Sequence, residues 1–425
     1  MDLPTSTARR SGQRTTRSGM HAVRHKCVVH LALPAGEVDA FAAGSVRAPV
    51  AGWMDSGVAA GCSPCARSPG SAVAVIRSRT TALTAAGAES ANYPFCTIEP
   101  NTGVVPVHDP RLQQLNSVQP TEKVIPTSVE IVDIAGLVRG ASKGEGLGNQ
   151  FLGNIRNVDA VLHVVRCFTD PDVIHVDGGV DPVRDIETIE LELAMADLES
   201  AQRRLDRFTK QSKSGNKEAA FHRDVAQRMV DLFSDGVAAR NGEWTAEEWA
   251  SVLDAQLITS KPVLYVCNVD EEGLSGDSDL VAAVRAHAEG EGSGFVVICG
   301  NVEAEISELD KEDRDAFLED LGLTEPGLHR LARATFELLG LQTYFTCGPK
   351  EIRAWTIRKG YKAPQAAGVI HTDFERGFIR AEVYTIPELL EYKNEAGLKA
   401  AGKLRVEGKD YEVQDGDVMH FRFNV

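Results

Sequence analysis

The sequence predicts an α/β protein whose main domain is a mostly parallel sheet with a helical insertion, followed by a small β-rich C-terminal domain. Short apolar, β-branched runs alternate with helical or loop sequence, which is typical of buried parallel strands. One long charged segment instead spaces its apolar residues by three and four, the period of a helix. From residue 341 onward, short alternating runs and glycine-containing turns favour a compact β domain.

The composition is that of a globular chain large enough for two or three domains. Of its 425 residues, 43% are apolar and 25% are charged. No run of about 18 apolar residues occurs, so we expect no membrane span and no membrane partner. The eight cysteines are scattered and several adjoin apolar runs, which is typical of reduced thiols rather than of a disulfide framework. Cys62 and Cys65 have the spacing of a zinc or redox pair, but no second ligand pair accompanies them and we expect no site there.

Charge is distributed unevenly along the chain. Residues 1–88 hold ten Lys or Arg against four Asp or Glu, and residues 342–425 hold thirteen against twelve. Residues 89–341 hold twenty-two against forty-five, a net charge of −23. An acidic body repels polyphosphate, so any contact with nucleic acid must use local basic patches.

Residues 1–81 differ from the rest of the chain. Arginines lie among Ser and Thr, with Asp2 the only acid before Glu37, a composition that fits an organelle transit peptide. The Ala-, Gly-, Ser- and Pro-rich sequence that follows favours disorder. The alternative, which we favour, is that this segment is an artefact of the coding sequence, because recognisable sequence resumes abruptly at residues 82–87.

Four apolar runs predict successive strands of the parallel sheet, at residues 129–132, 160–165, 263–266 and 295–298. Between the second and third runs, residues 187–257 carry the helical spacing, with a polar break at 213–216. We interpret this segment as an antiparallel helical hairpin inserted in the sheet domain. Two roles are open for this hairpin: it packs within the protein, or it is a protruding arm that binds partners.

Two polar motifs follow predicted strands and mark the corners of a nucleotide site. Asp133 and Gly136 form an Asp-x-x-Gly motif directly after the first run, and a glycine-rich loop continues to residue 148. Asn268 and Glu271 follow the third run. Because the carboxyl ends of parallel strands meet at one edge of a sheet, we expect both motifs at that edge. Together they are typical of a P-loop GTPase-like domain, although Asp-x-x-Gly alone is a weak signal.

The phosphate side of this site combines metal ligands with a close backbone approach. We assign Asp133 and Gly136 as catalytic: the carboxylate holds a Mg²⁺-bound water and the Gly136 amide approaches a γ-phosphate. Thr97, in a polar loop at residues 92–101, is placed as a switch threonine that binds Mg²⁺ together with Asp133. Leu137 stands where many GTPases carry the glutamine that orients water, so we expect slow hydrolysis. No Gly-x-x-x-x-Gly-Lys-Ser/Thr string, whose amides and lysine cradle the phosphates, occurs in the sequence.

The base side predicts adenine rather than guanine. A guanine reader uses Asn-Lys-x-Asp, whose carboxylate accepts hydrogen bonds from the guanine ring; here Val269 and Glu271 replace the lysine and the aspartate. The longer Glu271 side chain misplaces its oxygens, and no lysine stacks on the base. A further corner, usually Ser/Cys-Ala-Lys, is Cys-Gly-Asn here. The assigned nucleotide-binding residues are Asn268, Val269, Glu271, Cys299 and Gly300.

On these motifs, residues 82–425 resemble the YchF subfamily of Obg-like ATPases. The resemblance rests on long strings, including Asp-Ile-Ala-Gly-Leu-Val-Arg-Gly-Ala-Ser-Lys-Gly-Glu-Gly-Leu-Gly and Ala-Trp-Thr-Ile-Arg-Lys-Gly. The matching segments are residues 92–103, 133–148, 268–271, 354–360, 363–380 and 413–418. In the family a first strand and a phosphate loop precede this region. Here residues 71–81 stand in their place, with Arg77 and Arg79 but without a glycine pair.

The resemblance implies a nucleotide-binding domain at residues 82–340, with the helical hairpin inserted, and a C-terminal TGS domain at 341–425. It implies binding and hydrolysis of ATP, with GTP used less well, and Mg²⁺ with K⁺ as an assisting ion. It also implies association with the ribosome or a ribosomal subunit in translation and stress regulation, in the cytoplasm and without a DNA partner. Organelle targeting is the alternative location if residues 1–81 hold a transit peptide. In the family the backbone at the position of Val269 contacts adenine, and the position of Thr97 contributes to metal binding.

The C-terminal segment carries a local excess of cations beside Trp355 and Tyr361. Cations interleaved with aromatic side chains suit the RNA backbone and base stacking, whereas a solvated face around a core tryptophan is the alternative. Residues 406–411 resemble a hairpin, and residues 415–417 a turn before a final strand at 418–423. The assigned RNA or ribosome contact residues are Lys350, Arg353, Arg358 and Lys359.

Two functions are compatible with these residues. The first is an ATPase that acts in translation, as the resemblance implies. The second is a nucleotide-incompetent ribosome- or RNA-binding protein, or an incomplete coding sequence of the first kind. The absent phosphate-loop lysine separates them, because without it the phosphates lose their main anchor.

Overall fold

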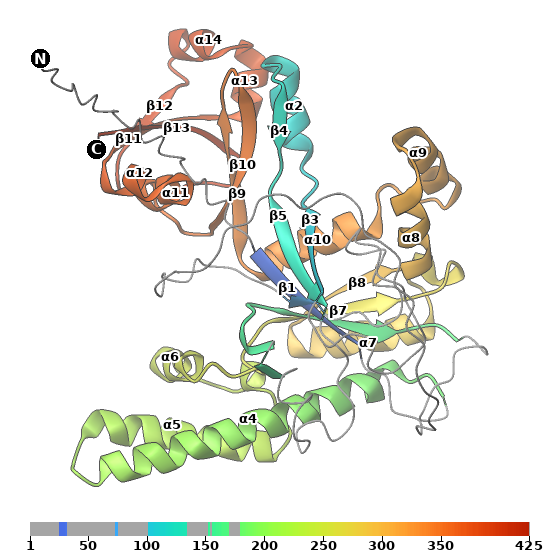
Figure 1. The fold of residues 1–425 in the computed structure, drawn as a ribbon, viewed down its shortest axis with the longest axis vertical. Helices are drawn as coiled ribbons and strands as arrows, with labels where there is room; N and C mark the ends of the chain where they lie inside the picture. The colour runs from blue at the N-terminus through green and yellow to red at the C-terminus, as the bar shows by residue number, and fades with distance from the viewer. Residues whose placement is uncertain are drawn as a thin grey trace, which may run out of the picture.

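The computed structural model describes residues 103–132, 152–153, 155–169 and 179–424, together with the backbone of residues 25–31, 73–74, 101–102 and 133. Two sheets form the body of the molecule, and a pair of long helices lies at the end of the first sheet (Figure 1). The expected α/β fold with a β-rich C-terminal domain is confirmed. Within the described ranges, no helix combines the length and the apolar character needed to cross a bilayer.

The first sheet has the strand order β3-β5-β1-β6-β7-β8, with β2 paired to β6 beside this path. Its pairs are parallel except for β3–β5, which is antiparallel. The four predicted runs form β5, β6, β7 and β8. The strands are β1 (His25–Leu31), β2 (Val73–Ala74), β3 (Asn101–Pro106), β5 (Ser128–Asp133), β6 (Val161–Arg166), β7 (Val263–Asn268) and β8 (Gly294–Ile298).

Two of these strands lie in the first 81 residues, where the sequence analysis expected none. β1 lies between β5 and β6, with Val29 opposite both Asp133 and Leu162. β1 therefore occupies a central position in the sheet. The apolar residues Val28, Val29 and Leu31 suit a buried strand, but a run this short among polar sequence gave too weak a signal. The rest of residues 1–81 lies outside the described part of the chain, so its expected disorder stays a prediction.

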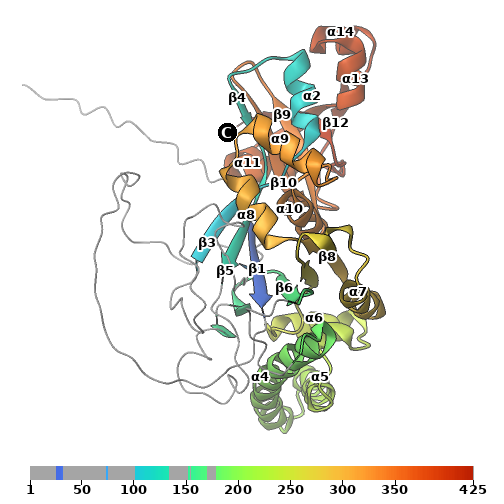
Figure 2. The ribbon, with the colours of Figure 1, turned by 90° about the vertical axis from the view of Figure 1, so that its right-hand side faces the viewer.

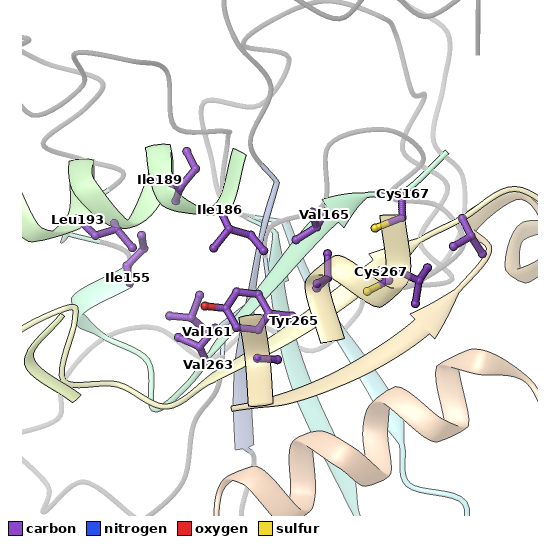
Figure 3. Close-up of a cluster of buried hydrophobic side chains, with 14 of the residues drawn as sticks. Ile155, Val161, Val165, Cys167, Ile186, Ile189, Leu193, Val263, Tyr265 and Cys267 are labelled. Carbon is purple, nitrogen blue, oxygen red and sulfur yellow. The ribbon is translucent and has the colours of Figure 1, made fainter. Parts of the chain in front are cut away.

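Helices cover both faces of the first sheet. On one face, α7 (Asp279–Glu291) packs on a cluster that includes Val263 and Tyr265, which Figure 3 shows beside residues of β6 and α4. On the other face, α10 (Gly327–Leu338) packs on a cluster that includes Leu264. Successive side chains of a strand point to opposite faces, so both faces must be apolar. This explains why the strands read as continuous apolar runs.

The charged segment forms two long antiparallel helices, α4 (Pro182–Ser212) and α5 (Lys217–Ser234), which extend away from the sheet (Figure 1). The polar break lies between them: Gly215 adopts a φ of +82°, which favours glycine, and Asn216 caps α5. α6 (Ala246–Asp254) contacts α5. The expected helical insertion is therefore present, and its role as an arm for partners stays a prediction. The shorter connections include η2 (Ala239–Asn241), η3 (Glu272–Ser275), α8 (Gly300–Glu308) and α9 (Lys311–Asp320).

The second sheet has the strand order β12-β11-β13-β9-β10-β4. Its pairs are antiparallel except for β13–β9 and β10–β4. The strands are β4 (Lys123–Ile125), β9 (Leu341–Cys347), β10 (Glu351–Arg358), β11 (Phe378–Thr385), β12 (Arg405–Glu407) and β13 (Asp417–Phe423). The associated helices are α11 (Ala363–Ile370), α12 (Thr372–Arg376), α13 (Ile386–Tyr392) and α14 (Glu395–Ala400).

Residues far upstream complete this second sheet and its core. β4 pairs with β10, and α2 (Pro110–Val118) buries Leu112 and Leu115 in a cluster with Phe345 of β9. Figure 1 shows α2 and β4 beside β10, with β4 leading directly into β5 of the first sheet. The second sheet therefore also includes residues that precede position 341, and the predicted domain boundary between residues 340 and 341 stays a prediction. A pairing between such distant segments has no local sequence signal.

The interpretation of residues 406–411 as a hairpin was wrong. β12 pairs with β11, its neighbour in the sheet, rather than with a strand that follows it directly. The final strand was predicted correctly: β13 begins at Asp417, and the preceding Gly416 adopts a φ of +92°.

Candidate functional site

The polar motifs after β7 and β8 meet at the carboxyl edge of the first sheet. β7 ends at Asn268, and β8 leads through Cys299 into α8, which begins at Gly300. The side-chain Oδ1 of Asn268 accepts a hydrogen bond from the Gly300 amide at 3.0 Å. A Cβ at position 300 would lie 3.4 Å from that oxygen, so glycine lets the loop approach Asn268 closely. This hydrogen bond therefore joins the loop after β7 to the start of α8.

Val269 and Glu271 take opposite positions in this corner. Val269 is 2% exposed and packs in the cluster under the sheet, and its amide donates to the Ile298 carbonyl at 2.9 Å. Glu271 is exposed at the start of η3. A buried valine cannot stack on a base as an exposed lysine does. The Glu271 carboxylate is one of three adjacent exposed carboxylates in this loop, with those of Asp270 and Glu272.

Cys299 is buried where β8 meets α8. Burial raises the pKa of its thiol, more than the amides of Val302 and Asn301 lower it, and the carboxylates of Glu271 and Asp270 add to the rise. The thiol is therefore neutral and unreactive. The assignment of Cys299 to the nucleotide site stays a prediction.

Asp133, on the phosphate side, ends β5 at the same edge of the sheet. Its backbone lies opposite Val29 of β1 and Asn101 of β3. β1 and β6 separate β5 from β7 by three strand spacings of about 4.8 Å, and the register places Asp133 level with Leu264, four residues before Asn268, so Asp133 lies roughly 20 Å from Asn268. Thr97, Gly136 and the side chain of Asp133 lie outside the described residues. Their catalytic and metal-binding assignments stay predictions.

β6 contributes a charged group that the sequence analysis missed. Arg166 is 6% exposed and lies opposite Asn268 in the β6–β7 register. Its Nε donates to the Phe168 carbonyl at 3.0 Å, and its guanidinium lies 4.7 Å from the centre of the Phe168 ring. A cation is thus held at the carboxyl edge between the two motifs. The available signal was an arginine at the end of a predicted strand, where α/β folds place ligand-binding groups.

A buried ion network lies behind β7, where the helical arm joins the sheet. Arg240 bonds Glu190 of α4 and lies 3.4 Å from Glu291 of α7, and the Tyr265 hydroxyl is 2.8 Å and 2.9 Å from the same two carboxylates. Burial alone would lower the pKa of Arg240, but the two carboxylates outweigh it and raise that pKa. Glu190, His287 and Glu291 are close enough to share a metal ion. The Arg240 guanidinium lies between the two carboxylates and compensates one of their two negative charges, so these side chains form an ion-pair network.

The predicted RNA-contact residues do not form one cluster. Lys350 precedes β10, whereas Arg358 ends it and Lys359 follows, so the eight-residue strand separates them by about 26 Å. All three are exposed. Cationic groups are therefore available at both ends of β10 but not as a continuous strip.

Trp355 and Arg353 belong to the packing of the second sheet. Trp355 is 8% exposed, and its Nε1 donates to the Thr346 hydroxyl at 2.8 Å. The Arg353 guanidinium covers the ring, 4.9 Å from its centre. The alternative of a core tryptophan is therefore correct, and Trp355 is not free to stack on a base.

Comparisons with known proteins match both parts of the chain. A family model described as a 50S ribosome-binding GTPase matches residues 78–204, and the YchF-GTPase C-terminal model, described as a protein of unknown function (DUF933), matches residues 341–424. A Pasteurella multocida protein named ribosome-binding ATPase YchF is 54% identical over 344 residues, which cover 81% of this chain and 94% of that protein. The Bacillus subtilis protein of the same name is 53% identical over 346 residues, with the same coverage.

A solved structure shows the same fold. The Schizosaccharomyces pombe YchF GTPase matches with a TM-score of 0.69 and 35% sequence identity, over 78% of this chain and 90% of that one. The sheet order, the helical insertion and the C-terminal domain described above agree with this likeness. On the family models, the sequence identities and the fold, the chain belongs to the YchF family.

Proposed function

We propose that this chain binds ATP in preference to GTP at the carboxyl edge of the parallel sheet and associates with the ribosome. Ribosome binding and ATPase activity are named for its relatives. The observation that carries the nucleotide part is the Asn268–Gly300 hydrogen bond at 3.0 Å, which joins the two base-side loops into one corner. That corner lacks the exposed lysine and the aspartate that guanine recognition requires.

Adenine is the base that this corner suits. An adenine edge presents no paired donors of the kind that an aspartate in Asn-Lys-x-Asp accepts, so the loss of that aspartate costs adenine nothing. For guanine, the shifted Glu271 oxygens leave ring donors poorly bonded, and an imperfectly satisfied polar group costs about 1–3 kcal/mol. The preference for ATP over GTP therefore comes from weaker binding of guanine rather than from a special contact with adenine.

Hydrolysis of ATP is proposed from the family, with Mg²⁺ held by Thr97 and Asp133 and with K⁺ assisting. In this chain the string that anchors the phosphates is absent, so we propose that turnover is much slower than the family's chemistry allows. Arg166 is the one cation that we find at the carboxyl edge within the described strands, and it is bonded to the Phe168 carbonyl rather than exposed to a ligand.

The absent phosphate loop favours a second candidate function, ribosome or RNA binding without nucleotide. The cations at the two ends of β10 support this alternative, because phosphate contacts alone supply affinity that does not depend on nucleotide. In that case the helical arm and the C-terminal domain would be the functional surfaces.

Competition for nucleotide separates the two candidates. The full chain is titrated with a fluorescent ATP analogue, which is then displaced by ATP or by GTP at millimolar concentration. We expect ATP to displace it at lower concentration than GTP. Replacing Glu271→Asp shortens the carboxylate toward the guanine-reading length and should shift the ratio toward GTP by about tenfold, the equivalent of 1.4 kcal/mol.

The neighbouring Glu272→Asp is the matched control, because Glu272 is also exposed on η3 but does not occupy the aspartate position. Replacing Val269→Lys as well would place an ammonium group at a position that is 2% exposed, so the single change at residue 271 is the cleaner test. GTP displacing the analogue better than ATP would contradict the adenine assignment. No displacement by either nucleotide would favour the second candidate.

A further inference from the structure

The helical arm, formed by α4 and α5, ends in a positively charged surface. The turn between the two helices lies at the end of the arm that is farthest from the parallel sheet (Figure 1). Figure 2, in which the helices are seen nearly end-on, shows the arm at the end of the molecule opposite the second sheet. Residues 182–202 of α4 hold one Lys or Arg against six Asp or Glu, whereas residues 203–218 hold six against two, a net charge of +4. The positive charge of the arm is therefore concentrated at its free end, which we name the arm tip (residues 203–218).

Most cations of the arm tip have no acidic partner. Two are already paired, Arg203 with a glutamate of α4 at 3.6 Å and Arg204 with an aspartate of α6 at 3.0 Å. The other four are exposed and form no ion pair within the described residues: Arg207, Lys210, Lys213 and Lys217. The acids Asp206 and Glu218 flank these four cations without pairing with them. An excess of two positive charges therefore remains on the exposed surface.

The cations of α4 form a row along one face of the helix. Arg203, Arg207 and Lys210 are spaced by four and three residues, so their side chains are neighbours on the helix surface. At 1.5 Å per residue the row is about 10 Å long, and it leads to Lys213 at the C-cap. The Arg207 guanidinium lies 4.5 Å from the centre of the Phe208 ring, a contact that positions the cation without neutralising it. Cations in such a row can contact successive phosphates of one nucleic-acid strand.

Helix stability accounts for only part of this charge. Lys210 and Lys213 lie at the C-terminal end of α4, where the helix dipole favours a cation. Lys217 is the first residue of α5, where the dipole disfavours a cation and favours an acid such as the neighbouring Glu218. The charge of Lys217 therefore does not stabilise the helix that it begins, which points to a partner outside the arm.

The composition of the turn fits a nucleic-acid backbone better than a protein. Residues 209–218 consist of Thr, Lys, Gln, Ser, Gly, Asn and Glu, without an apolar side chain. Protein interfaces take most of their affinity from buried aromatic and arginine anchors, which residues 209–218 lack. Contacts with phosphate instead use lysine together with the side chains of Ser, Thr, Asn and Gln and main-chain amides.

We propose that the arm tip binds the phosphate backbone of RNA. Arg207, Lys210, Lys213 and Lys217 each contact a phosphate, and the polar side chains of the turn add hydrogen bonds. Because no residue of the arm tip exposes an aromatic ring for a base to stack on, the contact does not depend on base sequence. This inference rests on the ribosome association proposed above, because it assigns a surface of the chain that contacts ribosomal RNA.

Fluorescence polarisation with the full chain measures this contact apart from the ribosome. The probe is a labelled RNA hairpin with a stem of about 16 base pairs, the length that a double-stranded-RNA-binding domain spans. Lys217→Glu is the sharpest variant, because the new acid suits the start of α5 but repels phosphate. We expect the variant to bind the hairpin about tenfold more weakly, with a thermal unfolding midpoint equal to or above that of the wild type. Unchanged affinity would overturn the proposal.

The salt dependence of RNA binding counts the phosphate contacts. Replacing Lys213→Gln together with Lys217→Gln removes two of them, so the slope of log affinity against log salt should become shallower by about two. The matched control is Lys399→Gln with Lys409→Gln, two exposed lysines of the C-terminal domain, which changes the net charge equally and should leave the slope unchanged. Equal changes of slope in both double variants would contradict the proposal.

Competition separates RNA from an acidic protein as the partner. Polyglutamate, added at the same concentration of charge as the RNA, should not displace the hairpin from the wild type. Displacement at equal charge would show that the arm tip binds acidic chains in general and would overturn the assignment to RNA. Failure of the wild type to bind the hairpin would overturn it as well.

Co-sedimentation with ribosomes distinguishes this inference from the function on which it rests. We expect the Lys213→Gln and Lys217→Gln double variant to co-sediment less than the wild type and less than the control. If the wild type and this variant co-sediment equally, the arm inference is refuted and the ribosome association stands. If the wild type does not co-sediment, the ribosome association is refuted, whereas the hairpin titrations still decide whether the arm tip binds RNA.

Discussion

The parallel sheet brings polar residues from distant parts of the chain to one edge, whereas the C-terminal sheet spreads its cations along a single strand. Asp133 and Asn268 are far apart in sequence but both end strands at the carboxyl edge. Lys350 and Lys359 are close in sequence but lie at opposite ends of β10. A polar motif after a parallel strand is therefore better evidence for a site than a cluster of charges within one strand.

The two sheets also differ in how they depend on distant sequence. Helices α7 and α10 cover the β7–β8 end of the parallel sheet; α7 directly precedes β8 in sequence, and α10 follows β8 after α8 and α9. The C-terminal sheet instead receives α2 and β4 from residues 110–125, more than two hundred positions upstream. We infer that a fragment of residues 342–425 would expose the apolar surface that α2 covers, so experiments on this domain need the full chain.

The largest effect is expected from breaking this long-range contact. Leu115 is 0% exposed in the core of the C-terminal domain, so Leu115→Ala should lower the free energy of unfolding by about 2–5 kcal/mol. Gln113→Ala, on the exposed side of the same helix, should have little effect. Urea unfolding followed by circular dichroism would report the change. Equal stability of the two variants would show that α2 is not part of that core.

A smaller effect on the free energy of unfolding is expected from the titration of His163, which is buried in the parallel sheet. Burial, with the nearby charges of Arg240 and His287, lowers the pKa of His163 to about 3. In the unfolded chain histidine titrates near pH 6.5, so below that pH the unfolded state binds a proton that the folded state does not. The free energy of unfolding should therefore fall by about 2 kcal/mol between pH 7 and pH 5. His163→Phe, which keeps a ring next to Tyr265, should remove this loss.

Thermal unfolding of the wild type and of His163→Phe at both pH values would measure the difference. His371→Gln is the control, because His371 is exposed in the C-terminal domain and should not change the pH dependence. If the wild type and His163→Phe lose the same stability on acidification, His163 is not the group responsible. That result would also mean that pH-dependent stability does not distinguish the parallel sheet from the C-terminal sheet.

The smallest effect is expected from the exposed cations at one end of β10. Reversing Arg358 and Lys359 to glutamate should weaken co-sedimentation of the full chain with ribosomes by about tenfold and reduce its salt dependence. Reversing Lys399 and Lys409, two exposed lysines elsewhere in the same domain, is the matched control. Equal binding of both double variants would exclude β10 as the contact.

The sequence predicted the structure correctly where the signal lies in residues that are neighbours along the chain. The apolar run of β7 predicted both the strand and the position of Asn268, and the polar break at 213–216 predicted the turn between α4 and α5. The sequence did not predict contacts between segments that are far apart along the chain. Nothing near Lys123 indicates that β4 pairs with β10, and nothing near Trp355 shows which face of its strand is covered.

ATP turnover by the full chain with Mg²⁺, measured beside Asp133→Ala, tests the central claim most directly. The claim is that the two loops on the base side of the nucleotide site are in place, whereas the Gly-x-x-x-x-Gly-Lys-Ser/Thr motif that would anchor the phosphates is absent from the sequence. We therefore predict ATP binding weaker than about 1 mM, the equivalent of 4.1 kcal/mol. We also predict turnover so slow that it exceeds that of Asp133→Ala only slightly. Tighter binding, together with Mg²⁺-dependent turnover that Asp133→Ala abolishes, would contradict the account.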